Sequence, residues 1–124
     1  MRSYILLTVE NLECKDPLGM ENGVISDDQI SASSQWDIPN AADRARLHLV
    51  RVQKAGAWAA ASNNANQWLQ IYLGSQVTKV TRVATQGRYD HVQRVTKYKL
   101  QYGNDGKSWQ YFREHGHSAD KVDW

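Results

Sequence analysis

The sequence is poor in cysteine, and Cys14 is the single one among 124 residues. One cysteine cannot close a disulfide within the chain, which indicates either a reducing compartment or a partner cysteine that lies elsewhere. Long apolar runs are missing too, because no segment approaches the ~20 apolar residues of a membrane-spanning helix. The apolar run 4–9 follows Arg2, but it is too short for a signal peptide, and no cleavage site of small residues follows it. We therefore expect neither an internal disulfide nor a membrane span in this sequence.

The motifs of the common enzyme classes are also absent. The sequence contains no GxSxG, HExxH, GxGxxG or phosphate-binding P-loop. His115 and His117 have no third ligand nearby, so side chains in solvent explain them better than a metal site. Cys14 has no neighbouring histidine that would activate its thiol. Asp27 and Asp28 suit calcium, but carboxylates near the positive end of a helical turn explain them equally well. We expect no catalysis, no cofactor and no metal.

Composition and charge are those of a globular chain with an unusual set of aromatic residues. Hydrophobic residues at 41% exclude a disordered chain. The net charge of +2 argues neither for nor against nucleic acid, but a dedicated nucleic-acid binder usually has a denser basic stripe. The sequence contains five Trp and six Tyr but only one Phe. Most are expected in the core, but Trp and Tyr are also favoured where a surface meets sugars, lipids or proteins. Basic residues are dense between positions 82 and 99, which suits either anionic lipid headgroups and acidic glycans or a solvated strand face.

Alternating patterns predict a chain of short strands. Residues 68–73 alternate apolar and polar side chains, and residues 77–85 are rich in Val and Thr. We therefore predict that the two segments are strands joined by a turn. Residues 96–102 alternate most regularly, and the turn 104–106 leads to a returning strand at 109–112. Short strands joined by turn-rich loops predict an antiparallel sandwich or barrel.

Two short helical turns are predicted before these strands. Residues 26–30 resemble one turn of helix that Ser26 caps. Residues 41–49 contain helix-forming Ala and Arg, but Leu47, Leu49 and the following Val50 and Val52 favour an extended chain, so we expect a short turn that leads into a strand.

Three loops carry the side chains that suit ligand binding: residues 35–42, 50–56 and 88–95. Trp36 and Ile38 have little reason to occur in so polar a loop unless they fold back on the core or are exposed for a ligand. If the loops meet at one end of a sandwich, their mixture of apolar and basic groups suits a lipid headgroup, an extended peptide or a glycan. The candidate ligand-binding residues are Trp36, Asp37, Ile38, Arg51, Lys54, Arg88, Tyr89, His91 and Arg94.

Six segments in this order resemble a known family: CKDPLGMENGVISDDQISASSQW, DRARLHL, AGAW, NQWLQIYLG, VTRVATQGR and VTKYKLQYGNDGKSWQYF. The family is the discoidin domain, also called the coagulation factor V and VIII type C domain, and the resemblance covers residues 14–112. It implies an all-β, antiparallel, jelly-roll-like β-sandwich similar to galactose-binding domains. It also implies an extracellular, secreted or cell-surface, non-enzymatic module for cell adhesion. Such modules bind phospholipid, collagen, other proteins or carbohydrate through loops at one end.

By this resemblance, the three loops correspond to the family's three ligand-binding spikes. Trp36 and Ile38 match the apolar tips of membrane-binding relatives, and Arg51, Lys54 and Arg94 match the basic residues behind them, although the second spike lacks a large apolar tip. The expected partner is therefore an anionic phospholipid, a matrix protein such as collagen, or a glycan, with peripheral membrane contact and no nucleic acid. The alternative is a carbohydrate-binding lectin, or an accessory module of a carbohydrate-active enzyme.

The resemblance also suggests how the chain divides. Residues 1–13 read as an N-terminal extension, and residues 14–124 as a discoidin domain that is truncated at its C-terminus. In the family the cysteine that matches Cys14 pairs with one at the end of the domain, so we expect Cys14 to be unpaired here. A fold without its last strands exposes a sheet edge, which would allow self-association with another copy.

Overall fold

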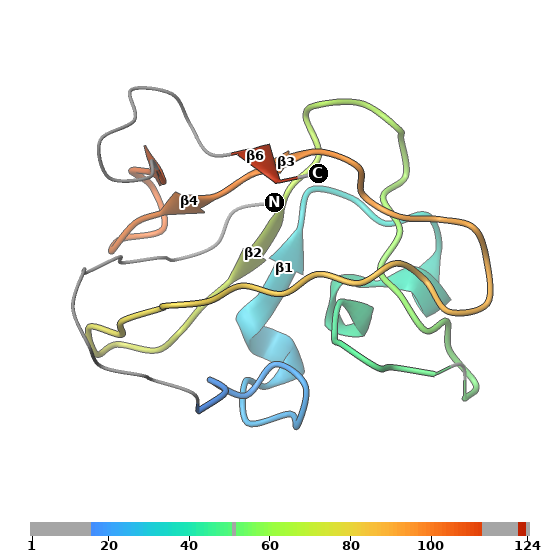
Figure 1. The fold of residues 1–124 in the computed structure, drawn as a ribbon, viewed down its shortest axis with the longest axis horizontal. Coiled ribbons are helices and arrows are strands. Elements are labelled where there is room, and N and C mark those ends of the chain that lie inside the picture. The colour runs from blue at the N-terminus through green and yellow to red at the C-terminus, as the bar shows by residue number, and fades with distance from the viewer. Residues whose placement is uncertain (1–15, 51, 113–121, 124) are drawn as a thin grey trace.

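The computed structural model describes residues 16–50, 52–112 and 122–123 (Figure 1). Expectations for residues 1–13, Cys14, Arg51, His115 and His117 lie outside these described residues. Within the described part, no helix has the length and apolar character that a membrane crossing requires.

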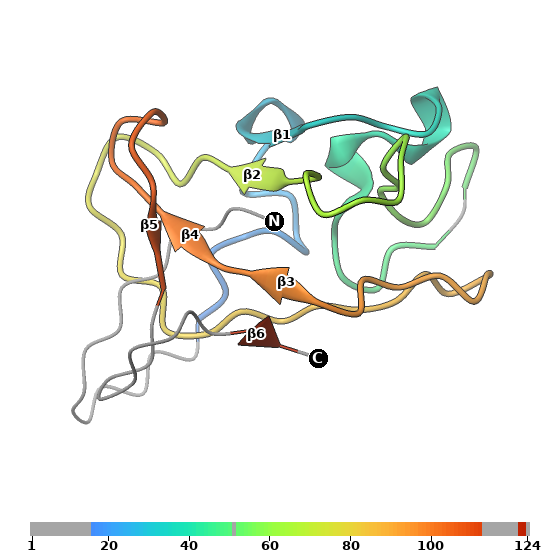
Figure 2. The same cartoon turned by 90° about the horizontal axis from the view of Figure 1, so that it is seen from above.

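All strand pairs in the described part are antiparallel. The strands are β1 (Ile30–Ala32), β2 (Leu69–Ile71), β3 (Tyr98–Lys99), β4 (Gln101–Tyr102), β5 (Gln110–Tyr111) and β6 (Val122–Asp123). They form three two-stranded ladders, β1–β2, β3–β6 and β4–β5. Figure 2 shows the β1–β2 ladder apart from the run of β3 and β4. This arrangement is consistent with the predicted all-β discoidin fold. In the part of the chain that the structure describes, the other regular structure is three short 3-10 turns and an isolated bridge between Val52 and Lys54.

The predicted hairpin at residues 96–112 is confirmed. Gln101 pairs with Tyr111, and Tyr102 pairs with Gln110. In the turn, Asp105 accepts hydrogen bonds from the backbone N–H groups of residues 107 and 108, each at 2.8 Å, and Gly106 has φ of +71°. Glycine adopts this left-handed conformation at little cost, which is why local sequence alone specifies the turn.

Both predicted helical turns are confirmed as 3-10 turns. The first is η1 (Asp27–Gln29), where Oε1 of Gln29 accepts hydrogen bonds from the backbone N–H and the hydroxyl of Ser26 at 3.0 and 3.2 Å. The second is η3 (Ala42–Arg44). A third turn, η2 (Ile38–Asn40), lies between them.

Two predicted strands are wrong. Residues 77–85 form no ladder within the described part, and β2 pairs instead with β1, with Ser31 opposite Gln70. Val80 from this segment packs with Leu100 and Phe112, so the segment contributes to the core through its side chains. The strand expected after η3 is also missing from the described residues, because His48 and Gln53 have positive φ values of 56° and 63° that interrupt extended backbone.

Among the described residues, the core contains two clusters. One contains Val80, Leu100 and Phe112, and the other contains Ile25, Ile30 and Leu69. Leu73, just beyond β2, packs against both clusters. The segment that follows β1 leaves the second cluster and enters the first of the three candidate loops, so the core fixes where that loop begins.

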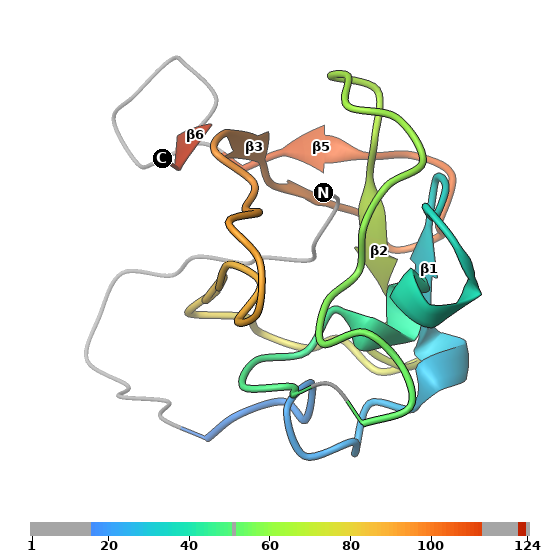
Figure 3. The ribbon, with the colours of Figure 1, turned by 90° about the vertical axis from the view of Figure 1, so that its right-hand side faces the viewer.

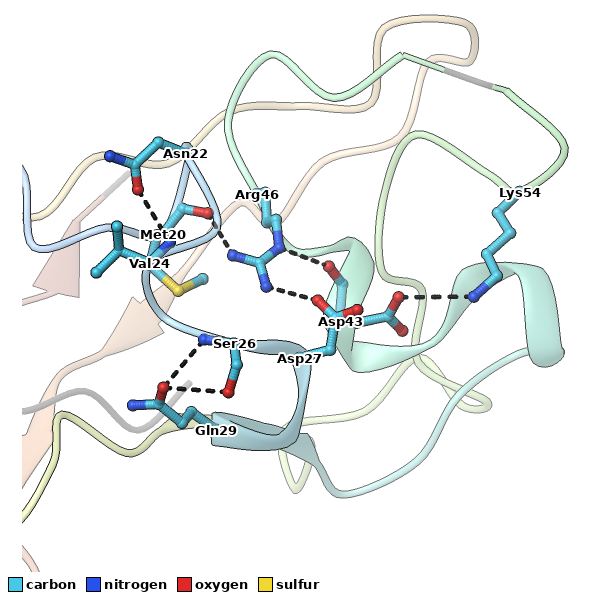
Figure 4. Close-up of polar contacts among 9 residues, drawn as sticks. All are labelled: Met20, Asn22, Val24, Ser26, Asp27, Gln29, Asp43, Arg46 and Lys54. Atoms are coloured by element: carbon cyan, nitrogen blue, oxygen red, sulfur yellow. Dashed lines mark hydrogen bonds and ion pairs between the residues drawn. The ribbon is translucent and has the colours of Figure 1, made fainter.

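Arg46 joins three segments beside the second cluster (Figure 4). Its side chain is 8% exposed, and its guanidinium donates to the carbonyl oxygens of Met20 and Asp43 and to Oδ1 of Asp27, at 2.5, 3.2 and 2.6 Å. A nearly buried cation needs such partners because burial removes its water. Arg46 therefore fixes η1, η3 and the segment before η1 relative to one another.

Candidate functional site

The three candidate loops meet at one end of the molecule (Figure 1, Figure 3). We call them loop 1 (35–42), loop 2 (50–56) and loop 3 (88–95). Ala55 donates its backbone N–H to the Pro39 carbonyl oxygen at 3.0 Å, which joins loop 2 to loop 1. Arg88 Nη1 donates to Oδ1 of Asn40 at 3.5 Å, which joins loop 3 to loop 1. A pocket of about 190 Å³ lies between them, lined by Asp37, Pro39, Asn40, Gln53, Lys54, Ala55, Arg88 and His91.

Loop 1 is rigid at its base and exposed at its tip. Asp37 caps η2, because its Oδ1 accepts the backbone N–H of Asn40 at 3.0 Å. Asn40 is buried, and its carbonyl oxygen accepts the N–H of Ala59 at 3.2 Å. Trp36 and Ile38 are 70% and 78% exposed, so their side chains do not fold back on the core. The loop therefore presents an aromatic and an aliphatic side chain to solvent on a fixed backbone.

Loop 2 also carries exposed apolar side chains. Val50 and Val52 are 55% and 69% exposed, whereas Ala55 is buried. The loop is held from behind, since Arg44 Nε donates to the Ala55 carbonyl oxygen at 2.7 Å. Lys54 Nζ lies 3.9 Å from Oδ2 of Asp43 (Figure 4), a long contact for an ion pair. Arg51, the other predicted cation of this loop, lies outside the described residues.

Loop 3 is folded around Arg88. The Arg88 side chain is 12% exposed, and its Nε donates to Oδ1 of Asp90 at 2.7 Å. Its Nη1 also donates to Oε1 of Gln93 at 3.1 Å. The hydrogen bond from Arg88, helped by that from His91, lowers the pKa of Asp90 to about 2. Arg88, predicted from the sequence as a ligand-binding residue, therefore holds the loop together from inside.

Loop 3 presents its apolar residues outward. Tyr89, Val92 and Val95 are 55%, 96% and 55% exposed. Tyr89 also lies against loop 2, because a Cβ built on Gly56 would come within 2.9 Å of the Tyr89 ring. Arg94 is exposed and lines a second, larger cavity of about 1080 Å³, rather than the pocket between the loops.

Together the loops form one surface with apolar tips around a polar centre. The tips are Trp36 and Ile38 in loop 1, Val50 and Val52 in loop 2, and Tyr89, Val92 and Val95 in loop 3. The polar centre is the pocket, whose titratable groups are the carboxylate of Asp37 and the basic side chains of Lys54, Arg88 and His91. Among the described residues, no three His, Cys, Asp or Glu side chains gather as metal ligands would. The arrangement is suited to bind a small anionic or hydroxyl-rich group while apolar side chains contact its surroundings.

Several residues of this surface were missed from the sequence. Val50 and Val52 lie at the start of a predicted loop but favour an extended chain, so the sequence alone does not show that both side chains are exposed. Asp90 gives a usable signal, since it follows Arg88 by two residues and opposite charges at that spacing can pair within a turn. Asn40 gives no usable signal in the sequence, because an asparagine after a proline is typical of any loop.

Comparison with known proteins gives a consistent picture. The model of the F5/8 type C domain matches residues 29–123. Lactadherin of Rattus norvegicus is 43% identical over 121 residues, which are 93% of this chain and 28% of that protein. The EGF-like repeat and discoidin I-like domain-containing protein 3 of Homo sapiens is 41% identical over 123 residues, which are 94% of this chain and 25% of that protein. Coagulation factor V of Sus scrofa is 39% identical over 115 residues, 88% of this chain and 5% of that protein. The chain thus spans about a quarter of the first two relatives.

Proposed function

Because this chain belongs to the F5/8 type C, or discoidin, domain family, we propose that it is an extracellular, non-catalytic binding module for cell adhesion. The ligand surface is the end formed by loops 1, 2 and 3. The ligand is an anionic phospholipid membrane, which the loops contact from one side without crossing it.

The exposed apolar side chains on all three loops carry this proposal. Ile38, Val52 and Val92 are 78%, 69% and 96% exposed, one on each loop. Such exposure on three adjacent loops is unfavourable in water and marks an interaction surface. Complete burial of one aliphatic side chain contributes about 1.5–3 kcal/mol, and insertion into the headgroup region recovers part of it. The free energy that three inserted tips contribute together is therefore larger than the ~1 kcal/mol that a single cation near an anionic membrane contributes.

The pocket supplies the preference for anionic headgroups. Lys54 is exposed, and its ammonium is as far as 3.9 Å from the carboxylate of Asp43, so it is available to a ligand. Arg88 is ion-paired with Asp90 and bonded to Gln93, so its charge is partly compensated and it contributes a weaker positive potential than Lys54. A phosphate or carboxylate in the pocket would gain a hydrogen bond from Lys54 and attraction from Arg88. We therefore expect apolar contacts to set most of the affinity and the pocket to set the selectivity.

Cosedimentation with vesicles tests the proposal. The chain is mixed with phosphatidylserine vesicles and with neutral vesicles, at low and at physiological salt. We expect binding to the anionic vesicles that weakens with salt and falls on Trp36→Ala. If a chain that circular dichroism shows to be folded binds neither kind of vesicle, the membrane is not its ligand.

A glycan is the second candidate, and the lining of the pocket favours it. Asp37, Asn40 and Gln53 offer donors and acceptors for hydroxyl groups, and exposed Tyr89 provides a ring for stacking on a sugar. Under this alternative the module is a lectin or an accessory part of a carbohydrate-active enzyme. Binding to a glycan array that is lost on Tyr89→Ala, together with no vesicle binding, would favour it. Self-association through an open sheet edge is a separate proposal, which the mass of the chain in solution tests.

A further inference from the structure

Residues 19–25 form a closed loop whose tip carries Asn22 and Gly23. The ends of the loop are joined by a hydrogen bond from the Ile25 N–H to the Gly19 carbonyl oxygen at 3.0 Å. Both tip residues are exposed. Gly23 has φ of +83°, and a Cβ built on it would meet no atom within 4 Å. The backbone of Gly23 therefore carries no side chain, and the space that a side chain there would occupy is open.

The Asn22 side chain lies over the backbone of this tip. Its Oδ1 accepts the N–H of Val24 at 3.1 Å (Figure 4), an Asx turn. A donor on Oδ1 polarises the amide and stabilises the negative charge that develops there when a nucleophile attacks Cγ. Within the described part of the chain, Nδ2 of Asn22 donates no hydrogen bond, so nothing there holds the leaving group.

We propose that Asn22 is a modification site that deamidates spontaneously. The backbone nitrogen of Gly23, after losing its proton to solvent, attacks Cγ of Asn22 and forms a new C–N bond. The bond between Cγ and Nδ2 breaks, ammonia leaves with a proton from solvent, and a five-membered succinimide results. Water then opens the ring at either carbonyl, which gives aspartate or isoaspartate at position 22. The reaction consumes one water and releases one ammonia, without oxidant or reductant.

The other comparable pair in the sequence is protected. Asp105 precedes Gly106, which also has a positive φ of +71° and open space beside it. However, hydrogen bonds from the backbone N–H groups of Ser108 and Lys107 lower the pKa of Asp105. An ionised carboxylate is a poor electrophile, whereas the side chain of Asn22 is a neutral amide that a nucleophile can attack at Cγ. Asn22 is thus the reactive one of the two positions.

Modification at Asn22 would change the support of η1 and η3. The neighbouring Met20 carbonyl oxygen accepts a hydrogen bond from Arg46, and Glu21 Oε1 lies 2.7 Å from Nδ1 of His48. Isoaspartate lengthens the main chain by one carbon inside the closed loop, and either product adds a negative charge beside Glu21. We expect the aged chain to unfold at a lower temperature than the fresh one, because the position of Met20 against Arg46 is disturbed.

Incubation of the folded chain at mildly alkaline pH tests this inference independently of the ligand. Samples taken over time are digested, and the peptides are separated and weighed. We expect the peptide with Asn22 to gain a single mass unit and to split into aspartate and isoaspartate forms, with isoaspartate in excess. Asn64 and Asn104, also exposed but not followed by glycine, are internal controls that should stay unchanged. Asn22→Gln should abolish the signal and leave the fold intact.

Two results would overturn the inference. In the first, the urea-unfolded chain deamidates at Asn22 but the folded chain does not within the same period. This result would show that the closed loop protects the site. The other is equal conversion at Asn22 and Asn104, which would show that neither the glycine nor the Asx turn matters.

Discussion

Arg88 donates a hydrogen bond from Nε to Oδ1 of Asp90 at 2.7 Å, with 12% and 18% of the two side chains exposed. The same guanidinium reaches Gln93 within loop 3 and Asn40 in loop 1. The pair therefore determines the shape of loop 3 and its position against loop 1. Because the exposed apolar tips depend on that shape, the Arg88–Asp90 contact connects the stability of the loops to the proposed membrane surface.

The first prediction concerns pH. The pKa of Asp90 falls from 3.8 to about 2 in the folded chain. A carboxyl with a depressed folded-state pKa stabilises the fold fully above its unfolded-state pKa, and loses that contribution as the pH falls through the folded-state value. The difference in unfolding free energy between the wild type and Asp90→Asn should be constant above about pH 4 and should shrink as the pH falls towards 2. Urea unfolding at a series of pH values measures it, and a difference that does not change with pH would contradict the assignment.

The second prediction concerns the close approach of loops 2 and 3. A Cβ at Gly56 would lie 2.7 Å from the Leu49 carbonyl oxygen and 2.9 Å from the Tyr89 ring. Gly56→Ala should therefore move Tyr89 and weaken membrane binding. Gly106→Ala is the matched control, since its positive φ costs about 1–2 kcal/mol of stability but its Cβ meets nothing and lies far from the loops in sequence. Equal vesicle binding by both variants at matched folded fractions would refute this role of Gly56.

The third prediction concerns Arg46. Arg46→Ala leaves the carbonyl oxygens of Met20 and Asp43 without their donor, and each unsatisfied buried acceptor costs about 1–3 kcal/mol. We expect a loss of roughly 2–5 kcal/mol in unfolding free energy, measured by chemical denaturation, with a smaller loss for Arg46→Lys. Arg82→Ala, an exposed arginine, is the control and should change stability little. A small effect of Arg46→Ala would mean that η1 and η3 are positioned by apolar packing alone.

The fourth prediction concerns Lys54. Its contact with Asp43 is long and exposed, so Lys54→Ala should leave the melting temperature nearly unchanged. Affinity for anionic vesicles should fall by about 1 kcal/mol, or roughly fivefold, and binding should become less sensitive to salt. Lys107→Ala in the distant hairpin is the control of equal charge. If both variants bind equally well, Lys54 and the pocket do not contribute to recognition of the anionic headgroup.

The hairpin at 96–112 and the turn η1 were predictable because their determinants are local. Gly106 supplies the positive φ, Asp105 supplies the acceptor, and Ser26 and Gln29 cap each other across one turn. The pairing of β1 with β2 was not predictable from these patterns, since it joins Ser31 to Gln70 across a long stretch of chain. The apolar alternation of residues 68–73 predicts a strand, but it does not predict which segment of the chain pairs with that strand.

The candidate site was predictable only in part. Family resemblance indicated which loops to consider, and Trp36 and Ile38 are exposed as that reading requires. The burial of Arg88 was not foreseen, because a cation in a loop is usually solvated and its partners become visible only when loop 3 folds back on itself. The exposure of Val52 was hidden for the opposite reason: positive φ at Gln53 turns an apparent strand into a loop.

The most direct test of the membrane surface replaces one apolar tip on each loop. The variant is Ile38→Ser, Val52→Ser and Val92→Ser together, and its control is Val24→Ser with Val77→Ser, whose side chains are 73% and 92% exposed outside the three loops. Partition onto phosphatidylserine vesicles is measured for both at physiological salt, after circular dichroism shows that they are folded. The proposed membrane surface requires the loop variant to lose at least roughly tenfold in partition while the control binds as the wild type does. Equal binding by the two folded variants would contradict it.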